Sequence, residues 1–333
     1  MKRILGKALF FVLVAALAST PALAQKWKAT KTITLIIPWG AGGASDLTAR
    51  VVAGEMERPL GAKIAVINQP GASGSTGTQY AFDMPHDGYT WTGNADASVA
   101  TYQVDALTPK ISHTQWQAYL AMKNPAIICV NPKSPIRSWD DLVNAFKTRD
   151  VSVASAGVGA GGHIAAETVK KALGINYKHV PYAGGNPAVI ATVSGECEVI
   201  MQLSMEEADM IRAKKLIPIA VMSPNPLVID GYGTIPSANQ FVPSMPSVAF
   251  NFGLFIPRDI PADAKAAIAA AFDTAARSKA VLDLAKAKAC EAVDIQGTEA
   301  DTVMNDAASV FGWLKYDAGV SPVNPQSLGI PRL

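Results

Sequence analysis

The chain has 333 residues, which indicates two domains or one large one, since domains usually hold roughly 100 to 200 residues. Lysine and arginine total 29 against 27 acidic residues, but three of the basic residues and none of the acidic ones fall in the first 24 positions. The remaining chain is therefore nearly neutral and has no basic cluster, which argues against nucleic-acid binding. With 49% hydrophobic residues, the composition also excludes a disordered chain.

The first 24 residues have the pattern of a secretory signal peptide. A basic start precedes an apolar run from Ala8 to Ala18, and Ala22-Leu23-Ala24 forms a cleavage site before Gln25. A membrane anchor is the alternative, but this run has 11 residues, whereas a transmembrane helix needs about 20. We therefore predict export and cleavage before Gln25.

From Thr32 onward, short apolar runs alternate with amphipathic segments. Continuous apolar runs are typical of parallel strands covered on both faces, so the alternation predicts an α/β fold. The predicted strands are, in chain order, ITLIIP, KIAVIN, YTWTGN, AIICVN, VSVASA, YKHVPY, CEVIMQ, LIPIAVMS and FGLFIP. Helices are predicted over 261–278 and 298–316, among others. Ser138 and Thr298 each precede an aspartate by three residues, which predicts a capping box at both positions.

Two further features concern prolines and cysteines. Five prolines between Pro224 and Pro246 predict a long connection between domains. Cys129 and Cys197 lie in apolar, strand-like runs, which favours buried core thiols, although a disulfide between them stays open. No cysteine pair or nearby histidine has metal-ligand spacing, so we predict no metal and no cofactor.

Four glycine-rich loops follow predicted strands, at the edge where open α/β sheets bind ligands. They are PWGAGGASD (Pro38–Asp46), NQPGASGSTG (Asn68–Gly77), ASAGVGAGGH (Ala154–His163) and YAGGNP (Tyr182–Pro187). In the first loop, three glycines let backbone N–H groups turn inward, and the next helix adds positive partial charge at its N-terminus. Such a loop suits a carboxylate or a phosphate.

The third loop also contains a Gly-x-Gly-x-x-Gly pattern at Gly157, Gly159 and Gly162, as in dinucleotide-binding proteins. However, the acidic residue expected about 20 positions later is absent, and no glycine loop carries a Walker A lysine. Nor does the chain contain a Gly-x-Ser-x-Gly or His-Glu-x-x-His motif, so the residues favour binding over catalysis. A dinucleotide-binding oxidoreductase and an exported enzyme with an oxyanion cradle remain the alternatives.

Several side chains in these loops have two interpretations. Ser45 and Asp46 cap the following helix or contact a ligand. Trp39 belongs to the core or forms the apolar wall of a pocket. His163 donates to an anion or faces solvent, whereas His86 lies in a turn sequence and is interpreted as structural.

Four stretches of the chain resemble, in order and spacing, the tripartite tricarboxylate transporter substrate-binding proteins, the TctC or Bug family. They are PWGAGGASDLTAR, VINQPGASGSTG followed by DGYT, ASAGVGAGGHIAAE and HVPYAGGNPAVIATVSGECEVI. The resemblance implies a periplasmic solute-binding protein of class II type, not an enzyme. Two lobes, each a mostly parallel sheet flanked by helices, would close on a small carboxylate. It places lobe 1 at 25–125 plus 248–333 and lobe 2 at 126–247, with hinges near 123–126 and 246–251.

The resemblance also implies the ligand-binding residues, position by position. From lobe 1 they are Trp39, Gly40, Ala41, Gly42, Gly43, Asp46, Gly71 and Ser73, and from lobe 2 they are Ser155, Ala156, Gly157, Gly159, His163, Tyr182 and Gly184. Facing loops at helix N-termini suit a dicarboxylate. Departures from the family pattern at Trp39, Trp91 and Gln202 point to a flatter or larger acid, such as an aromatic one. The implied partners are this acid and the membrane subunits of the transporter, with the protein itself a monomer.

Overall fold

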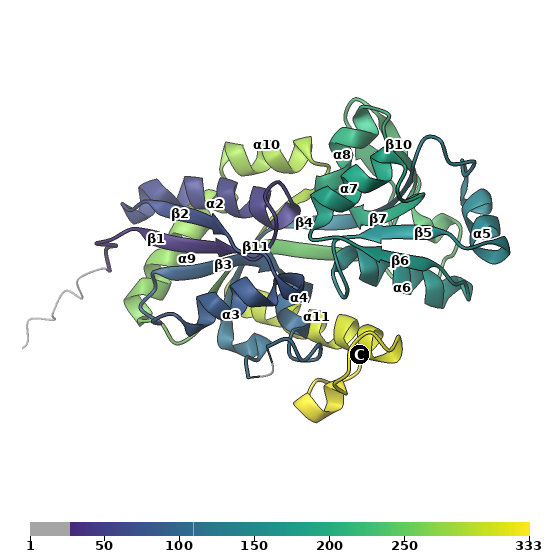
Figure 1. The fold of residues 1–333 in the computed structure, drawn as a ribbon. Coiled ribbons are helices and arrows are strands. Elements are labelled where there is room, and N and C mark those ends of the chain that lie inside the picture. The colour runs from purple at the N-terminus through teal and green to yellow at the C-terminus, as the bar shows by residue number, and fades with distance from the viewer. Residues whose placement is uncertain (1–26, 109) are drawn as a thin grey trace, which may run out of the picture.

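The computed structural model describes residues 27–108 and 110–333. The predicted signal peptide lies outside the described residues. The described chain forms two α/β lobes that lie side by side and share one sheet, with the strand order β2-β1-β3-β11-β4-β7-β5-β6 (Figure 1). The α/β class predicted from the continuous apolar runs is therefore confirmed.

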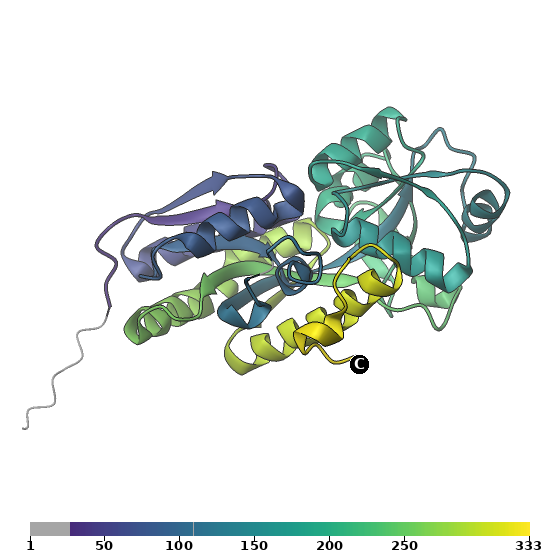
Figure 2. The same ribbon diagram turned by 60° about the horizontal axis from the view of Figure 1, so that its bottom comes forward.

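Lobe 1 is built from the two ends of the chain. Its elements are β1 (Ile33–Ile37), α2 (Ala44–Leu60), β2 (Ile64–Asn68), α3 (Ser75–Asp83), β3 (Thr90–Ala95), α4 (Asp96–Thr101), β11 (Ala249–Pro257), α9 (Ala262–Ala276), α10 (Lys279–Ala287), β12 (Glu291–Ile295) and α11 (Gly297–Asp317). Strands β1, β2 and β3 are parallel, whereas β11 enters antiparallel between β3 and β4. Helices α2, α9 and α10 pack together, as do α4 and α11 (Figure 2).

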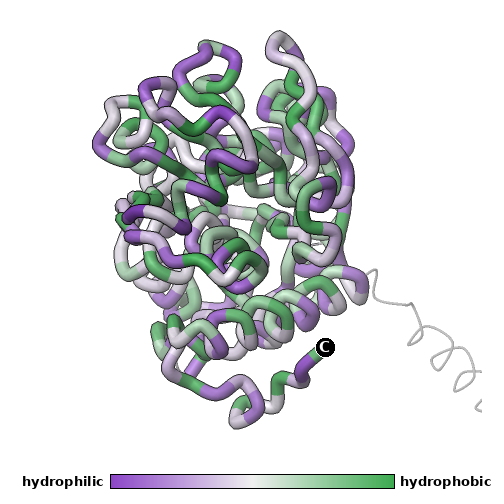
Figure 3. The backbone as a smooth tube through the Cα atoms, turned by 90° about the vertical axis from the view of Figure 1, so that its right-hand side faces the viewer, coloured by the Kyte–Doolittle hydropathy of each residue, from purple (hydrophilic) through white to green (hydrophobic). Residues whose placement is uncertain are grey.

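Lobe 2 is built from the middle of the chain. Its elements are α5 (Trp139–Thr148), β5 (Ser152–Ser155), α6 (Gly161–Leu173), β6 (Lys178–Pro181), α7 (Gly185–Ser194), β7 (Val199–Leu203), α8 (Ser204–Arg212), β8 (Ile217–Val221), β9 (Leu227–Ile229) and β10 (Gly233–Ile235). Strand β5 pairs in parallel with β6 and β7. Hydrophobic and hydrophilic residues are interspersed along the backbone (Figure 3). In lobe 2, helix α6 packs its buried residues against β5 and β7.

One long strand, β4 (Trp116–Val130), belongs to both lobes. Its first part pairs with β11 and β12 as far as Pro125, and its second part pairs with β7 and β8 from Ala126 onward. Beside this switch, the Ala126 N–H donates to the Val248 carbonyl at 2.8 Å, where the chain returns to lobe 1. Two backbone segments therefore run between the lobes at the same place.

The sequence predicted only the second half of β4. Asn124 and Pro125 are poor strand residues, and they interrupt the apolar run. The strand nevertheless continues through both residues, and Asn124 Oδ1 accepts from the Met205 N–H at 3.3 Å and from Cys290 Sγ at 2.7 Å. Strand β12 and the short hairpin of β9 and β10, inside the proline-rich segment, were also not predicted from the sequence.

The two predicted capping boxes have different outcomes. Ser138 caps α5 in a complete box with Asp141, as predicted. The box at Thr298 is wrong, because α11 begins at Gly297 and its N-cap makes no side-chain hydrogen bond. The aspartate of that motif, Asp301, is instead paired with Arg258.

The buried side chains agree with the predicted strands. Leu35, Ile36 and Ile37 of β1 and nearly all of β7 are inaccessible to solvent. All three cysteines are free, and Cys129 and Cys197 are buried, which confirms core thiols and not a bond between them. Within residues 27–108 and 110–333, no helix combines the length and apolar character needed to cross a bilayer.

Candidate functional site

A cavity lies between the lobes and offers about 40 Å³ to the centres of water-sized molecules. From lobe 1 it is lined by Trp39, Gly40, Gly43, Ala44, Ser45, Ala95, Ala97, Ser98, Phe250 and Phe252. From lobe 2 it is lined by Ala156, Ala160, Gly161, Ile164, Gly184, Gly185, Asn186, Pro187, Gln202, Leu203 and Glu206. The lining is mostly apolar, and Glu206 is its one charged side chain among the described residues.

Three helices begin at this cavity. The N-cap residues are Gly43 for α2, Ala160 for α6 and Gly184 for α7, and none of these residues caps its helix through its own side chain. Because the first-turn N–H groups of a helix have no partner within it, an uncapped N-terminus presents donors and positive partial charge. The convergence of three such ends makes the cavity suited to an anion.

The first loop is held in shape by Asp46, which is nine-tenths or more buried. Its carboxylate accepts from the Gly42 N–H at 3.0 Å, from Asn68 Nδ2 at 2.9 Å and from Arg50 Nε at 2.9 Å. Asp46 therefore neither caps α2 nor lines the cavity. It fixes the turn that precedes α2.

Trp39 forms one wall of the cavity and is also fixed in place. Its indole Nε1 donates to Asn94 Oδ1 at 2.9 Å, and Asn94 Nδ2 donates to the Tyr102 hydroxyl at 3.0 Å. The ring lies against Gly74, where a Cβ would come within 2.8 Å of it. Both interpretations of Trp39 are therefore correct, because its side chain packs on the core and also lines the cavity.

Across the cavity, the first loop meets the fourth loop of lobe 2. A Cβ built on Gly40 would lie 3.5 Å from the Ala183 carbonyl oxygen, and a Cβ built on Gly184 would lie 3.8 Å from the Gly40 nitrogen. At the same contact, the Ala44 N–H donates to Glu206 Oε1 at 3.1 Å. Burial raises the pKa of Glu206, although hydrogen bonds from Gln202 and Ala44 oppose that shift.

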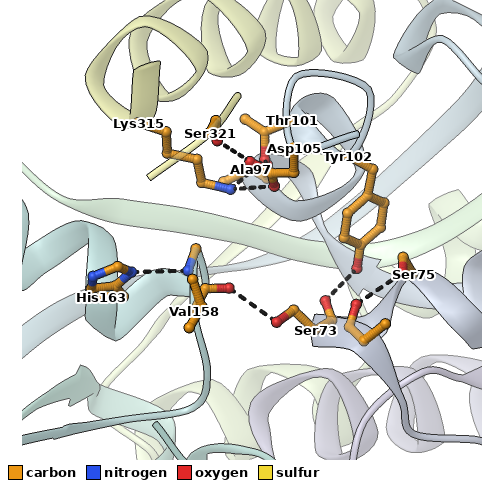
Figure 4. A network of polar contacts seen from close by, with 12 residues as sticks. Ser73, Ser75, Ala97, Thr101, Tyr102, Asp105, Val158, His163, Lys315 and Ser321 are labelled. Atoms are coloured by element: carbon orange, nitrogen blue, oxygen red, sulfur yellow. Dashed lines mark hydrogen bonds and ion pairs between the residues drawn. The ribbon is translucent and has the colours of Figure 1, made fainter. Parts of the chain in front are cut away.

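The third loop meets the second loop beside the cavity. Ser73 Oγ donates to the Val158 carbonyl at 3.0 Å, and the Tyr102 hydroxyl holds the Ser73 carbonyl at the same distance (Figure 4). From α11, Lys315 approaches this region, and its Nζ pairs with Asp105 Oδ2 at 2.8 Å. The contact between the second and third loops thus joins the lobes beside the cavity.

Five of the predicted ligand-binding residues line the cavity: Trp39, Gly40, Gly43, Ala156 and Gly184. The others lie in the same loops but do not line the cavity: Ala41, Gly42, Asp46, Gly71, Ser73, Ser155, Gly157, Gly159, His163 and Tyr182. Sequence analysis did not find Glu206, Phe250 or Phe252. Phe252 is the first residue of the predicted strand FGLFIP, so the start of that strand could have indicated a cavity-lining residue. No feature of the sequence indicated Glu206.

His163 supports its own loop. Its Nδ1 accepts from the Gly159 N–H at 2.9 Å, and its ring stacks on His179 with centroids 3.9 Å apart. Burial, with help from His179 and nearby lysines, lowers the pKa of His163 to about 3. The imidazole is therefore neutral near pH 7, and since it is 7% exposed the solvent-facing interpretation is wrong.

Asp96 starts α4 directly behind the cavity lining and is 2% exposed. Its carboxylate accepts from Asn251 Nδ2 and from the Ala97 N–H, both at 2.6 Å. Burial nevertheless raises the pKa of Asp96 to about 6. An aspartate in the unfolded chain ionises near pH 4, so the native state loses stability through this group as the pH rises from about 4 to 6.

We therefore expect Asp96→Asn to flatten part of the pH dependence of stability. Wild type loses stability through Asp96 as the pH rises, whereas the amide of the variant does not titrate. The free energy of unfolding of the variant minus that of wild type should therefore increase by about 2 kcal/mol between pH 4 and 7. Urea unfolding across this range measures the change. Asp140→Asn, at an exposed position on α5, is the matched control. Parallel stability curves for Asp96→Asn and wild type would contradict the expectation.

Two α/β lobes that share two crossing segments and face each other across a cavity define the two-lobed class of solute-binding proteins. The family model described as "Tripartite tricarboxylate transporter family receptor" (TctC) matches residues 48–313. The chain belongs to this family, which confirms the resemblance seen in its glycine loops.

Relatives of known sequence or structure agree with this assignment. Protein BugT of Bordetella pertussis is 28% identical over 228 residues, which cover 67% of this chain and 69% of BugT. The Rhodopseudomonas palustris protein Rpa4515, solved with adipate, superposes with a TM-score of 0.81 at 20% identity, covering 88% of this chain and 99% of its own. MatC from the same organism, solved with bound malate, has a TM-score of 0.77 at 20% identity and covers 86% and 99%. The two solved structures establish the likeness in fold.

Proposed function

We propose that this protein captures a small organic acid between its lobes and presents it to the membrane subunits of a tripartite tricarboxylate transporter. The observation that carries the proposal is the convergence of the N-termini of α2, α6 and α7 on one cavity. Backbone N–H groups at helix N-termini bind carboxylates without a cationic side chain. The adipate and malate found with the two structural neighbours are carboxylates, which supports the same chemistry here.

The rest of the cavity suits an apolar body on the acid. Trp39, Phe250 and Phe252 face it from lobe 1, and Ile164 and Leu203 face it from lobe 2. Because the Trp39 ring is held by Asn94, it presents a fixed flat surface. These contacts favour an acid with an aromatic or similarly flat apolar group.

We place the mature protein in the periplasm, as a monomer cleaved before Gln25. We also place the lobe boundaries at 25–125 plus 248–333 for lobe 1 and 126–247 for lobe 2. The change of partners along β4 between Pro125 and Ala126 supports these boundaries. Hinges near 123–126 and 246–251 would then let the lobes open and close, with the ligand favouring the closed state.

The third loop, which carries the Gly-x-Gly-x-x-Gly pattern, gives the dinucleotide-binding alternative less support than carboxylate binding. A pyrophosphate would need the N–H groups of the third loop. The Gly157 N–H donates to Ser155 Oγ at 3.3 Å, and the Gly159 N–H donates to His163 Nδ1. Two of the donors that a dinucleotide would use are therefore engaged within the loop.

A thermal-shift screen of residues 25–333 tests the proposal. We expect a selective rise in the melting midpoint with one class of mono-, di- or tricarboxylate, since a ligand that binds only the native state stabilises it by mass action. Aliphatic and aromatic acids are compared, with NAD included. A shift with NAD and none with any acid would overturn the proposal in favour of the dinucleotide alternative.

A further inference from the structure

The side chain of Glu206 occupies an anion position inside the cavity. Glu206 belongs to α8 of lobe 2, yet its Oε1 accepts from the Ala44 N–H in the first turn of α2 in lobe 1. Its other oxygen, Oε2, accepts from Gln202 Nε2. The carboxylate therefore sits where an uncapped helix N-terminus would otherwise bind a ligand carboxylate.

Two glycines make room for this carboxylate. A Cβ built on Gly43 would lie 3.3 Å from Glu206 Oε1, and a Cβ built on Gly185 would lie 2.1 Å from Glu206 Cδ. Gly43 precedes α2 and Gly185 begins α7, so the carboxylate lies between two helix N-termini, one from each lobe. A carboxylate-sized space with matching donors is thus already filled by the protein itself.

The cavity wall around Glu206 offers acceptors and no cation. Gln202, which is 2% exposed and lines the same cavity, leaves its Oε1 without a hydrogen-bond partner. No lysine, arginine or histidine among the described residues lines the cavity. A second carboxylate of a ligand would therefore meet a filled space and a negative charge on this side, and like charges in contact repel each other.

We propose that Glu206 takes the place of one end of a dicarboxylate, so that this receptor selects monocarboxylates with an apolar body over dicarboxylates. This inference rests on the proposed function. The remaining anion position is the first turn of α6, where Ala160 and Gly161 line the cavity and no side chain caps the helix. The ligand's single carboxylate binds there, and its apolar part lies against Trp39, Phe250 and Phe252.

Calorimetric titration with matched pairs of acids tests the proposal. Each pair shares a carbon skeleton: butanoate and succinate, hexanoate and adipate, and 4-methylbenzoate and terephthalate. Because burial raises the pKa of Glu206, titrations are made near pH 8, which favours the ionised form of its side chain. We expect wild type to bind the monoacid of the best pair at least about tenfold more tightly than the diacid. Glu206→Ala, which empties the position, should shift that ratio toward the diacid by about tenfold or more.

Glu207→Gln is the matched control, because Glu207 is the next residue of α8 and is fully buried but does not line the cavity. It should leave the ratio unchanged. An excess of acetate should refill the emptied position in Glu206→Ala and restore the preference for the monoacid. If Glu206→Ala fails to fold, Glu206→Gln removes the charge alone, and the ratio should move in the same direction.

The outcomes separate this inference from the proposed function. If the diacid binds wild type as tightly as the monoacid and Glu206→Ala leaves the ratio unchanged, the role of Glu206 is overturned while carboxylate binding stands. If no acid binds wild type or either variant, the proposed function fails and the inference fails with it.

Discussion

Gly43→Leu is expected to lower the affinity for the captured acid at least about 100-fold, which corresponds to about 2.7 kcal/mol. Gly43 has φ −78° and ψ 172°, a conformation that any residue adopts, so the change places no strain on the backbone. Its Cβ would already lie 3.3 Å from Glu206 Oε1 and 3.5 Å from the Gly40 carbonyl. The rest of the leucine side chain would extend into the cavity and occupy space that the bound acid needs.

The matched control for this variant lies on the same helix. Gly54 is exposed on α2, and no atom lies within 4 Å of a Cβ built there, so Gly54→Leu should bind like wild type. Titration calorimetry with the acid identified in the screen gives both affinities, and circular dichroism verifies that both variants are folded. Unchanged affinity in Gly43→Leu would remove the first loop from the binding site.

Gly162→Ala is expected to destabilise the protein by about 3 kcal/mol, the upper end of the usual cost of forced overpacking in a core. A Cβ at Gly162 would lie 2.1 Å from the Met201 carbonyl oxygen and 3.1 Å from the Ser155 Cβ. Met201 lies in β7, so the clash is with the backbone of a central strand and no side-chain movement relieves it. Helix α6 would have to move away from the sheet.

Gly54→Ala provides the comparison, because it makes the same change in an open helical position. We expect it to stabilise the protein by about 0.5 to 1 kcal/mol, the usual difference between glycine and alanine inside a helix. Guanidinium unfolding of both variants measures the two effects. Equal stability of Gly162→Ala and wild type would contradict the close contact between α6 and β7.

The glycine at position 162 shows how a sequence pattern and its physical cause can differ. The Gly-x-Gly-x-x-Gly pattern was typical of dinucleotide binding, yet its third glycine is needed for the contact of α6 with β7, whatever the ligand. The strands of both lobes could be predicted because continuous apolar runs report burial on two faces. The glycine loops could be predicted to surround a site because they follow those strands.

Other features could not be found in the sequence because they depend on contacts between distant residues. Glu206 lies in the segment SMEEADMIR, which has the composition of an exposed helix, and its partner Ala44 is 162 positions away. Asn124 and Pro125 break the local pattern of β4, and the strand persists only because the two lobes supply partners for it. Local preference identifies elements, but it does not identify what the tertiary fold brings to them.

The position of β11 in the sheet has a consequence for the chain during its synthesis. Strand β11 lies between β3 and β4 and is hydrogen-bonded to both, yet it follows β4 by more than 100 residues in sequence. Until Ala249–Pro257 are available, β3 and the first part of β4 have strand edges with no partner between them. Unpaired edges are sites of aggregation. Lobe 1 therefore completes its sheet only after all of lobe 2 has been made, and a chain truncated before residue 249 is expected to aggregate.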